Sequence, residues 1–384
     1  LLFAGAATPP PEEIDTTMPG VFRARTVTTP SGRYGHLRIF TFYVEDPYAF
    51  VAEFVRLAGL LPPDGLIVDV RGNSGGHLFA AEFTLQTLTP RPIVPEPMQF
   101  AATPLNLRIC RKPTEDLSDD LSLGPWVSSL EQATQLGAGF SSAFPMTPAA
   151  GANAWGQRYH GPVVLVTDAL CYSATDVFAA GFQDHGIGPV LGVDANTGAG
   201  GANVWTHELL RLLLDSAPAD PDNPYRPLPK GAEIRVAMRR NLRVGPRAGI
   251  LLEDLGVVPD VRHHLTRADV LAGNVDLLAR AGALLARMPV RALAVRPVRR
   301  GTELTLDVSA SGVDQVDVYL DGRPRGSVRV VDGVAAATIS GAGRARVARV
   351  EGFADGELVA ARTIRLQRAA GQPAGPTGTS TRST

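Results

Sequence analysis

Residues 161–201 contain the pattern that decides the fold, beginning with the run Pro162-Val163-Val164-Leu165-Val166 and continuing through Tyr172-Ser173-Ala174-Thr175-Asp176. The first run is continuous, apolar and rich in β-branched residues, which is typical of a buried strand. From Ser173 the apolar residues follow the period of a helix that ends near His185, and residues 189–193 have the pattern of the next strand. The sequence therefore places Ser173 at a strand-to-helix turn.

Two interpretations of Ser173 follow from this position. The first turn of a helix has unpaired backbone N–H groups and the positive end of the helix dipole, so it favours developing negative charge. Acyl transfer needs such a place, because its tetrahedral intermediate carries an oxyanion. Serine is also a common helix N-cap, and this stretch alone favours the cap.

A second strand-turn-helix unit lies upstream, in the segment Gly65-Leu66-Ile67-Val68-Asp69-Val70-Arg71-Gly72-Asn73-Ser74-Gly75-Gly76. A helix is expected from about residue 77 to residue 88. Glycines after a strand allow positive φ angles and let the backbone approach a ligand closely. The turn has neither of the common phosphate-binding glycine fingerprints.

These two segments, in this order, resemble the core of the S41 serine peptidases, which include the C-terminal processing proteases and the tricorn core protease. A third block agrees, because the stretch Glu253-Asp254-Leu255-Gly256-Val257-Val258-Pro259-Asp260 is similar to the family's E-x-x-G-V-x-P-D motif. The resemblance covers about residues 35–285. It implies an α/β core of the ClpP/crotonase type, with Ser173 as nucleophile and an oxyanion hole formed by the N–H groups of Ala174, Gly75 and Gly76.

The chain departs from the processing-protease branch at the general base. That branch uses a lysine in a Gly-Lys-Gly sequence, whereas here the place reads Thr197-Gly198-Ala199-Gly200-Gly201. The chain has only two lysines, Lys112 and Lys230, and neither lies at a matching position. A Ser/Lys dyad is therefore not expected. Asn203 lies near the place of the lysine's polar partner in that branch.

The tricorn branch uses serine, histidine and glutamate, and the resemblance puts Glu253 forward as the orienting carboxylate. The histidine of that branch lies in an upstream segment that this chain does not contain. A serine hydroxyl needs a base within hydrogen-bond reach. The candidates are a residue outside this chain or one of the histidines that flank the motifs, His77, His160, His185 and His207.

Two further residues near Ser173 have alternative roles. Asp184 lies about three helical turns after Ser173, so we interpret it as a structural residue that caps or pairs. Cys171 is a rival nucleophile, because a thiolate is intrinsically more nucleophilic than a hydroxyl. Buried cysteines are commonly inert, small apolar residues, and this second interpretation is favoured.

Composition limits the function classes. The formal net charge of the 384 residues is −1, so no overall field favours nucleic acid or an anionic membrane. No run approaches the length of a membrane-spanning helix, and no ligand spacing indicates a metal or an organic cofactor. Residues 1–7 are typical either of the end of a signal peptide, which would give a periplasmic or secreted location, or of the end of a preceding domain.

Four regions are predicted: an N-terminal linker or partial segment (1–32), the peptidase core (33–288), a β-sandwich of immunoglobulin-like type (289–368) and a disordered tail (369–384). Within the core, residues 90–160 are expected to form an insertion or lid whose aromatic residues bind substrate or anchor the loop, namely Trp126, Phe140 and Phe144. Thr266 and Asp269 are expected to form a capping box that opens a helix reaching about residue 288.

The predicted function is that of a serine endopeptidase, which cleaves polypeptide through an acyl-enzyme on Ser173. The substrate would add to the core as an extended strand. The alternatives are a peptide-binding protein that keeps the fold without turnover, and a scaffold protein in which the β-sandwich is the working part. The oligomeric state is left open.

Overall fold

The computed structural model describes residues 13–112, 122–200, 204–214 and 223–366, and these form two compact units, Leu1–Val290 and Arg291–Thr384. Each unit has its own apolar core. None of the helices in the described ranges is long and apolar enough to cross a membrane. Asn203, residues 1–12 and the predicted disordered tail lie outside the described residues.

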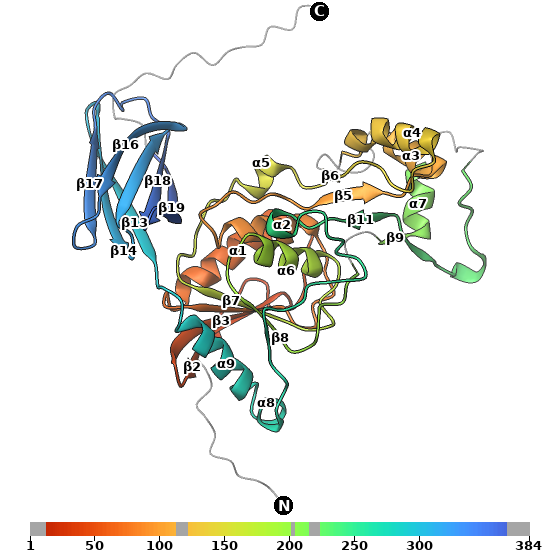
Figure 1. Cartoon of the computed structure of the whole chain (residues 1–384), viewed down its shortest axis with the longest axis horizontal. Coiled ribbons are helices and arrows are strands. Elements are labelled where there is room, and N and C mark those ends of the chain that lie inside the picture. The colour runs from red at the N-terminus through yellow and green to blue at the C-terminus, as the bar shows by residue number, and fades with distance from the viewer. Residues whose placement is uncertain (1–12, 113–121, 201–203, 215–222, 367–384) are drawn as a thin grey trace, which may run out of the picture. The chain divides into compact units, whose positions relative to one another are not determined.

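A seven-stranded sheet forms the centre of the first unit, in the order β1-β2-β3-β4-β7-β8-β12 (Figure 1). Its strands from β3 to β12 pair in parallel, whereas β1, β2 and β3 pair antiparallel. The bounds are β1 (Glu13–Ile14), β2 (Phe22–Thr29), β3 (Gly32–Ile39), β4 (Leu66–Asp69), β7 (Val163–Thr167), β8 (Val190–Gly192) and β12 (Val261–Arg262). The sheet thus begins upstream of the core boundary that was predicted at residue 33.

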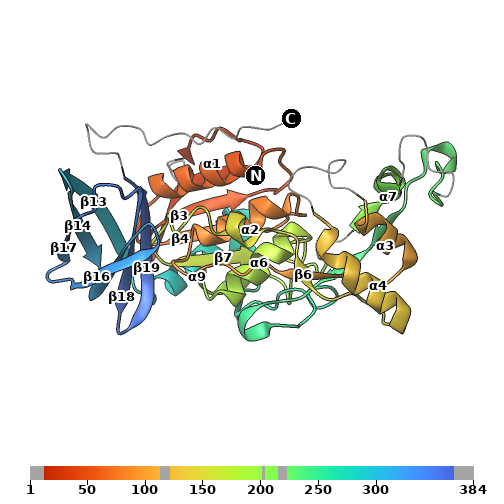
Figure 2. The same ribbon diagram turned by 90° about the horizontal axis from the view of Figure 1, so that it is seen from above.

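Helices cover both faces of this sheet (Figures 1 and 2). One face packs against α1 (Pro47–Leu60), α2 (Leu78–Gln86) and α6 (Ala174–Asp184), whose buried side chains share one apolar cluster with alternate residues of β2 and β3. The other face packs against α9 (Val275–Leu285). Strands β4 and β7 are covered on both sides, and for this reason their sequences are continuous apolar runs. The prediction of buried strands at these positions is confirmed.

The helix predicted from Thr266 to about residue 288 is two helices, α8 (Arg267–Leu271) and α9. The capping box of Thr266 and Asp269 is present. Gly273 and Asn274 both have positive φ angles of 68° and 67°, which a right-handed helix does not accommodate. This pair of residues breaks the helix, and the sequence pattern did not show it.

The predicted insertion builds a small subdomain together with a later segment. Strands β5 (Pro97–Phe100), β6 (Phe144–Pro145) and β11 (Arg239–Asn241) form one sheet, and β9 (Val204–Thr206) and β10 (Arg235–Ala237) form another. Helices α3 (Pro104–Cys110), α4 (Val127–Leu136) and α7 (His207–Leu214) lie together beside them (Figure 2). Trp126 is fully buried there, and its Nε1–H donates to the Met98 carbonyl at 2.8 Å, so this aromatic residue anchors the segment.

Short elements complete the first unit. Helix α5 (Ala149–Ala152) packs against α2. Short 3-10 turns are formed by Gly124–Trp126, Pro229–Gly231 and Gly245–Arg247.

The second unit contains two antiparallel sheets around one apolar core. One sheet has the order β13-β14-β17 and the other the order β16-β15-β18-β19. Their bounds are β13 (Ala292–Arg300), β14 (Glu303–Ser311), β15 (Gln315–Leu320), β16 (Arg323–Arg329), β17 (Val334–Ile339), β18 (Val347–Ala354) and β19 (Glu357–Arg365). This arrangement is compatible with a β-sandwich, as predicted; the immunoglobulin-like relationship stays a prediction.

A pair of buried carboxyl groups joins α2 to the subdomain. The Glu82 carboxylate accepts a hydrogen bond from the Glu96 backbone N–H at 2.9 Å and another from the Thr147 hydroxyl. Both glutamates are almost completely buried. Burial raises the pKa of Glu82 to about 7, and burial together with the nearby Glu82 raises the pKa of Glu96. The folded chain therefore holds a proton here that the unfolded chain releases at lower pH.

This pair predicts that stability falls as pH rises. The folded-state pKa of Glu82 is raised above its ordinary value of 4.5. Its contribution to the free energy of unfolding is therefore fully present below pH 4.5 and is lost as the pH rises through 7. The full contribution is about 3 kcal/mol. We expect Glu82→Gln to unfold at a higher urea concentration than the unmodified chain at pH 8, with no such gain at pH 4. An equal gain at both pH values would contradict the prediction.

Candidate active site

Ser173 lies between the end of β7 and the first residue of α6, as the sequence predicts, and it occupies the N-cap position without a capping bond from its side chain. Its backbone has φ 56° and ψ −125°, and its side chain makes no capping hydrogen bond. A non-glycine residue in this region costs about 1–3 kcal/mol, and such strain is concentrated at functional sites. The cap interpretation therefore fails on geometry. The hydroxyl is held at a strained strand-to-helix turn of the kind that exposes nucleophilic serines.

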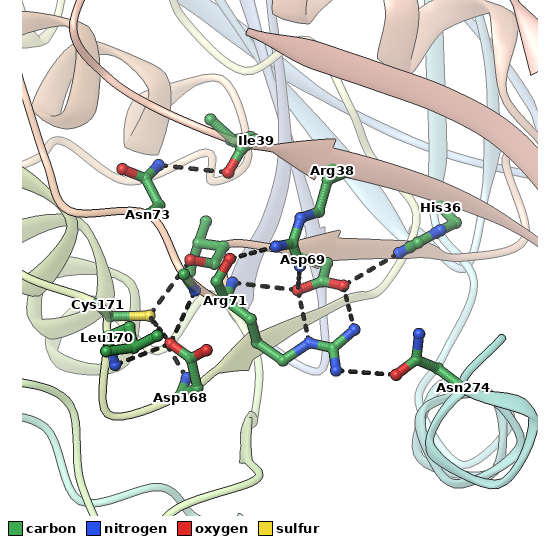
Figure 3. A network of polar contacts seen from close by, with 12 residues as sticks. His36, Arg38, Ile39, Asp69, Arg71, Asn73, Asp168, Leu170, Cys171 and Asn274 are labelled. Carbon is green, nitrogen blue, oxygen red and sulfur yellow. Dashed lines mark hydrogen bonds and ion pairs between the residues drawn. The ribbon is translucent and has the colours of Figure 1, made fainter. Parts of the chain in front are cut away.

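The turn before Ser173 is fixed by the Asp168 carboxylate and by the glycine-rich turn (Figure 3). Asp168 Oδ1 accepts from the N–H of Leu170 at 3.0 Å, from the N–H of Gly72 at 2.9 Å and from Cys171 Sγ at 3.3 Å. The Tyr172 N–H donates to the Asn73 carbonyl at 3.2 Å. The first and second sequence motifs are thus joined directly.

Cys171 is placed as an inert residue. It is fully buried, its Sγ lies 3.3 Å from the Val70 carbonyl, and burial raises the pKa of the thiol. A buried thiol with a raised pKa is a weak nucleophile. The structure therefore favours the apolar, structural interpretation of Cys171 over the rival nucleophile.

The glycine turn lies against Ser173. A Cβ atom on Gly75 would stand 2.6 Å from the Ser173 Cβ, and one on Gly76 would stand 2.1 Å from the Phe42 carbonyl carbon. The φ angles of Gly75 and Gly76 are 103° and 140°, which side chains rarely permit. These two positions therefore require glycine.

The predicted oxyanion-hole donors differ in their availability. The Gly75 N–H donates to Asn73 Oδ1 at 2.9 Å, so the turn itself uses this group. Within the described ranges, no acceptor is found for the N–H of Gly76 or for that of Ala174, the first residue of α6. Two of the three predicted N–H groups are thus without a hydrogen-bond acceptor in the described part of the chain.

The segment that replaces the family's lysine packs against the serine turn. Cβ atoms on Gly198 or Gly200 would each stand 2.4 Å from the Tyr172 ring, so this ring lies directly on the glycine backbone. Ala199, which stands nearest to the missing lysine, has a φ angle of 59°. No amine is provided at this place.

Asp176 holds this segment, and the sequence reasoning did not single it out. Its carboxylate accepts from the Gly200 N–H at 3.1 Å and from the Ala199 N–H at 3.4 Å. Asp176 is fully buried, and burial raises its pKa to about 6 against the opposing hydrogen bond from Thr197. A carboxylate three residues after the serine, in the first turn of the helix, was the available signal.

The third motif joins the end of the first, at Thr197 and Ala199, through its backbone. The Asp254 N–H donates to the Ala199 carbonyl at 3.2 Å, and the Thr197 N–H donates to the Val257 carbonyl at 3.1 Å. The side chain of Glu253 is engaged with β11, because its Oε2 accepts from the Asn241 N–H at 2.7 Å. The motif therefore lies beside the serine turn, while the structure ties the Glu253 carboxylate to the subdomain strand.

Three of the four candidate histidines are placed away from Ser173 or fully engaged. His160 precedes β7 and Ser173 follows it, so about 16 Å of strand separates them. His185 is the C-cap of α6, about 16 Å of helix from Ser173. His207 begins α7 in the subdomain, where its ring lies against Tyr225 at 5.6 Å.

Both ring nitrogens of His185 are occupied. Its Nε2 accepts from the Val94 N–H at 2.9 Å, and its Nδ1 lies 2.8 Å from the Gly181 carbonyl, to which it donates. Burial lowers the pKa of His185. It is a structural residue.

His77 is the candidate that adjoins the glycine turn. It follows Gly76 and caps α2, because its Nδ1 accepts from the Phe79 N–H at 3.2 Å. In the neutral ring this bond places the proton on Nε2. In this conformation His77 can donate a hydrogen bond through Nε2 but cannot accept the serine proton there.

Asp184 has the structural role that the sequence suggests. Its carboxylate lies 2.6 Å from Arg243 Nη2 and accepts from Arg243 Nε at 3.0 Å, and both side chains are buried. Arg243 also donates to Gln183 Oε1 at 2.9 Å. This pair fixes the end of α6 to the segment that leads from the subdomain to the third motif. In the described residues no group of three or more His, Cys, Asp or Glu residues is arranged to hold a metal ion.

Comparisons with solved structures agree with this fold. Mature CPAF is 16% identical with a TM-score of 0.50, and the match covers 70% of this chain and 55% of that one. CPAF complexed with lactacystin is 17% identical with a TM-score of 0.49, over 69% and 55%. The photosystem II D1 C-terminal processing protease is 17% identical with a TM-score of 0.36, over 66% and 48%. The chain thus spans about half the length of these structures. The likeness to mature CPAF, at 16% identity, shows the fold alone.

A search of curated proteins found no match. The model of peptidase family S41 matches residues 33–262, which is more than half of the chain. The chain therefore belongs to peptidase family S41.

Proposed function

We propose that this chain is a serine peptidase in which Ser173 Oγ attacks the scissile carbonyl of a polypeptide and forms an acyl-enzyme. Membership of a peptidase family supports peptidase function in general. The observation that carries the specific proposal is the strained Ser173 backbone, with a hydroxyl that is not used to cap α6. Such a conformation is costly and persists where the surrounding structure imposes it.

The oxyanion hole in this proposal consists of the N–H groups of Gly76 and Ala174. Gly75 contributes by its lack of a side chain, which lets the turn lie against Ser173, while its own N–H holds Asn73. The N-terminus of α6 adds its dipole to the developing negative charge. The tight fit of Gly75 against Ser173 supports this assignment over a role for the turn in binding phosphate.

His77 is the residue we propose as base among the four predicted histidines, because it directly follows the oxyanion-hole glycine. It would take the serine proton at Nε2 only after Nδ1 leaves the Phe79 N–H and becomes protonated. We propose Glu253, the family's orienting carboxylate by resemblance, as a positioning residue that acts through its hold on β11.

The alternative is a peptide-binding protein that retains the fold without turnover. Two observations favour it: the family's lysine is replaced by the sequence around Ala199, and the His77 Nδ1 is committed to the cap. In both functions the substrate is an extended polypeptide, whose main chain can pair with exposed strand edges.

Labelling with a fluorophosphonate probe separates the two functions. The peptidase predicts a covalent adduct on the unmodified chain, located on Ser173 by peptide mass mapping, and no adduct on Ser173→Ala. Ser74→Ala is a matched control, because Ser74 is an exposed serine of the neighbouring turn and should leave labelling unchanged. A folded chain that is not labelled under conditions that label a known serine peptidase would establish the binding protein instead.

A further inference from the structure

A cavity lies at the same edge of the central sheet as Ser173 but on the other face of the sheet. Its volume is about 460 Å³, which is within the range of small-ligand sites. In β3, Leu37 and Ile39 pack in the core with α1, α2 and α6, whereas His36 and Arg38 line the cavity on the α9 face. Ser173, at the start of α6, is not among the residues that line it.

One end of the cavity is cationic. It is formed by side chains of the β2–β3 hairpin, namely Arg23, Arg25, His36 and Arg38. Arg23 and Arg38 are directly opposite each other in the pairing of the two strands. Each of the two already pairs with a carboxylate, Arg23 with Glu13 at 2.9 Å and Arg38 with Asp69 at 2.6 Å, and Arg25 is the arginine of this end that makes no ion pair among the described residues.

Arg25 lies opposite Glu13 in the pairing of β1 with β2, but its guanidinium contacts a histidine ring instead of a carboxylate. Its Nε donates to His36 Nδ1 at 3.2 Å, and His36 Nε2 lies 3.4 Å from Asp69 Oδ2 (Figure 3). Among the described residues, no carboxylate forms an ion pair with Arg25. Burial and the neighbouring Arg23 lower the pKa of this guanidinium, and Glu13 and Asp69 oppose part of that shift. Its terminal N–H groups have the planar geometry that binds a carboxylate.

In the middle of the cavity, the Asp69 carboxylate balances the positive charges of Arg38 and Arg71. This buried carboxylate accepts from Arg38 Nη1 at 2.6 Å and from Arg71 Nε and Nη2 at 3.0 and 2.8 Å. Burial alone would raise the pKa of Asp69, but hydrogen bonds from His36 and Arg71 hold it well below its usual range. Arg71 Nη1 donates to Asn274 Oδ1 at 3.0 Å, so this arginine is held on both sides. Asp69 and Arg71 are bound to each other and line the cavity between its two ends.

The other end is acidic and is formed by Asp168 and Asp194. Asp168 follows β7 and Asp194 follows β8. Asp194 Oδ2 accepts from the Ala169 N–H at 2.9 Å, and Asp168 uses Oδ1 for all its bonds. Within the described chain, the second oxygen of each carboxylate has no donor. Figure 3 shows Asp168 on one side of the Asp69–Arg71 pair and His36 on the other.

We propose that this cavity binds a short peptide by its two charged ends, the carboxylate at Arg25 and Arg38 and the ammonium group at Asp168 and Asp194. The Arg25 guanidinium reaches β3 through its bond to His36, and the Asp194 carboxylate reaches the end of β7 through the Ala169 N–H. The strands β3 and β7 are separated by β4, so the two ends are about 10 Å apart. An extended peptide of three residues spans about 10 Å. A free amino acid is too short to reach both ends. This site does not depend on the function proposed for Ser173.

The site is joined to the Ser173 turn by Asp168. The same carboxylate that faces the cavity accepts from the N–H groups of Gly72 and Leu170, which hold the two turns together beside Ser173. A peptide bound at Asp168 therefore contacts the residue that sets this geometry.

The test is isothermal titration calorimetry of full-length Ser173→Ala, which prevents hydrolysis and makes the result independent of turnover. The probes are trialanine with free ends, its N-acetyl form and its C-terminal amide. We expect the free peptide to bind and each blocked form to bind about tenfold to a hundredfold more weakly, because each loses a charged hydrogen bond. Binding of all three peptides with equal affinity, or of none at millimolar concentration, would overturn the proposal.

Added substitutions locate the two ends. Arg25→Gln should weaken binding of the free peptide and leave binding of the amide unchanged, whereas Asp194→Asn should weaken binding of the free peptide and leave binding of the acetylated form unchanged. Arg33→Gln, on the same hairpin but at the far end of β3, is the matched control and should bind like the parent. If Arg25→Gln and Asp194→Asn both bind trialanine like the parent, the peptide lies elsewhere and the proposal is wrong.

Discussion

Gly75→Ala is expected to abolish covalent labelling of Ser173 while the chain remains folded. The new Cβ would stand 2.6 Å from the Ser173 Cβ and 2.7 Å from the Tyr172 carbonyl oxygen, so the two turns must separate. A displacement of about 1 Å at a reacting group costs about a hundredfold in rate. The φ angle of 103° adds backbone strain for alanine. The measurement is the rate of fluorophosphonate labelling, with circular dichroism to verify the fold.

Gly72→Ala is the matched control for this experiment. Gly72 lies in the same turn and also has a positive φ, 68°, but its nearest neighbour to an added Cβ is Arg38 Nη2 at 3.8 Å. We expect a modest loss of stability and nearly unchanged labelling. If Gly75→Ala reacts as fast as Gly72→Ala, the contact between the glycine turn and Ser173 has no part in the reaction.

Asp184→Asn is expected to give the largest loss of stability, about 3–5 kcal/mol in the free energy of unfolding, because it leaves the buried Arg243 without its counter-charge. The side chains of Arg243 and Asp184 are only 4% and 0% exposed, so water cannot replace the lost partner. Urea denaturation followed by fluorescence measures the change, with the dependence on urea concentration checked for two-state behaviour.

Two further variants make this result specific. Glu131→Gln removes the exposed ion pair with Arg111 in the same unit and should cost about 0–1 kcal/mol. The double variant Asp184→Asn/Arg243→Met removes both charges and should be more stable than Asp184→Asn alone. A loss for Asp184→Asn no greater than that for Glu131→Gln would show that the pair does not hold α6 to the following segment.

Local sequence patterns predicted the central layer of the fold well. Strands β4 and β7 are short apolar runs because helices cover both of their faces. The apolar residues of α6 follow a helical period, although every residue of this helix is buried. The N-cap Asp46 and the following Pro47 mark the start of α1 for local reasons as well. Each of these signals lies within a few residues of the element that it specifies.

The subdomain could not be predicted in the same way. Its strand β5 pairs with β11, where Met98 lies opposite Asn241, so the partners are far apart in sequence and each strand has only a few residues. The positive φ of Ser173 and the bond between Gly75 N–H and Asn73 are likewise products of the assembled turns. The family motifs named the residues of the site, but the geometry that decides their roles arises from tertiary packing.

The burial of Cys171 has a practical consequence for classifying the reaction. Its sulfur faces the Val70 carbonyl and the Asp168 carboxylate, and burial disfavours its thiolate form. Cys110, the other cysteine, is also buried, and burial raises its pKa. Iodoacetamide and similar alkylating reagents act on thiolates, so they should leave both cysteines of the folded chain unmodified at neutral pH. Inhibitor profiles of this chain can therefore be interpreted without a cysteine background, even though a thiol lies two residues from the hydroxyl under study.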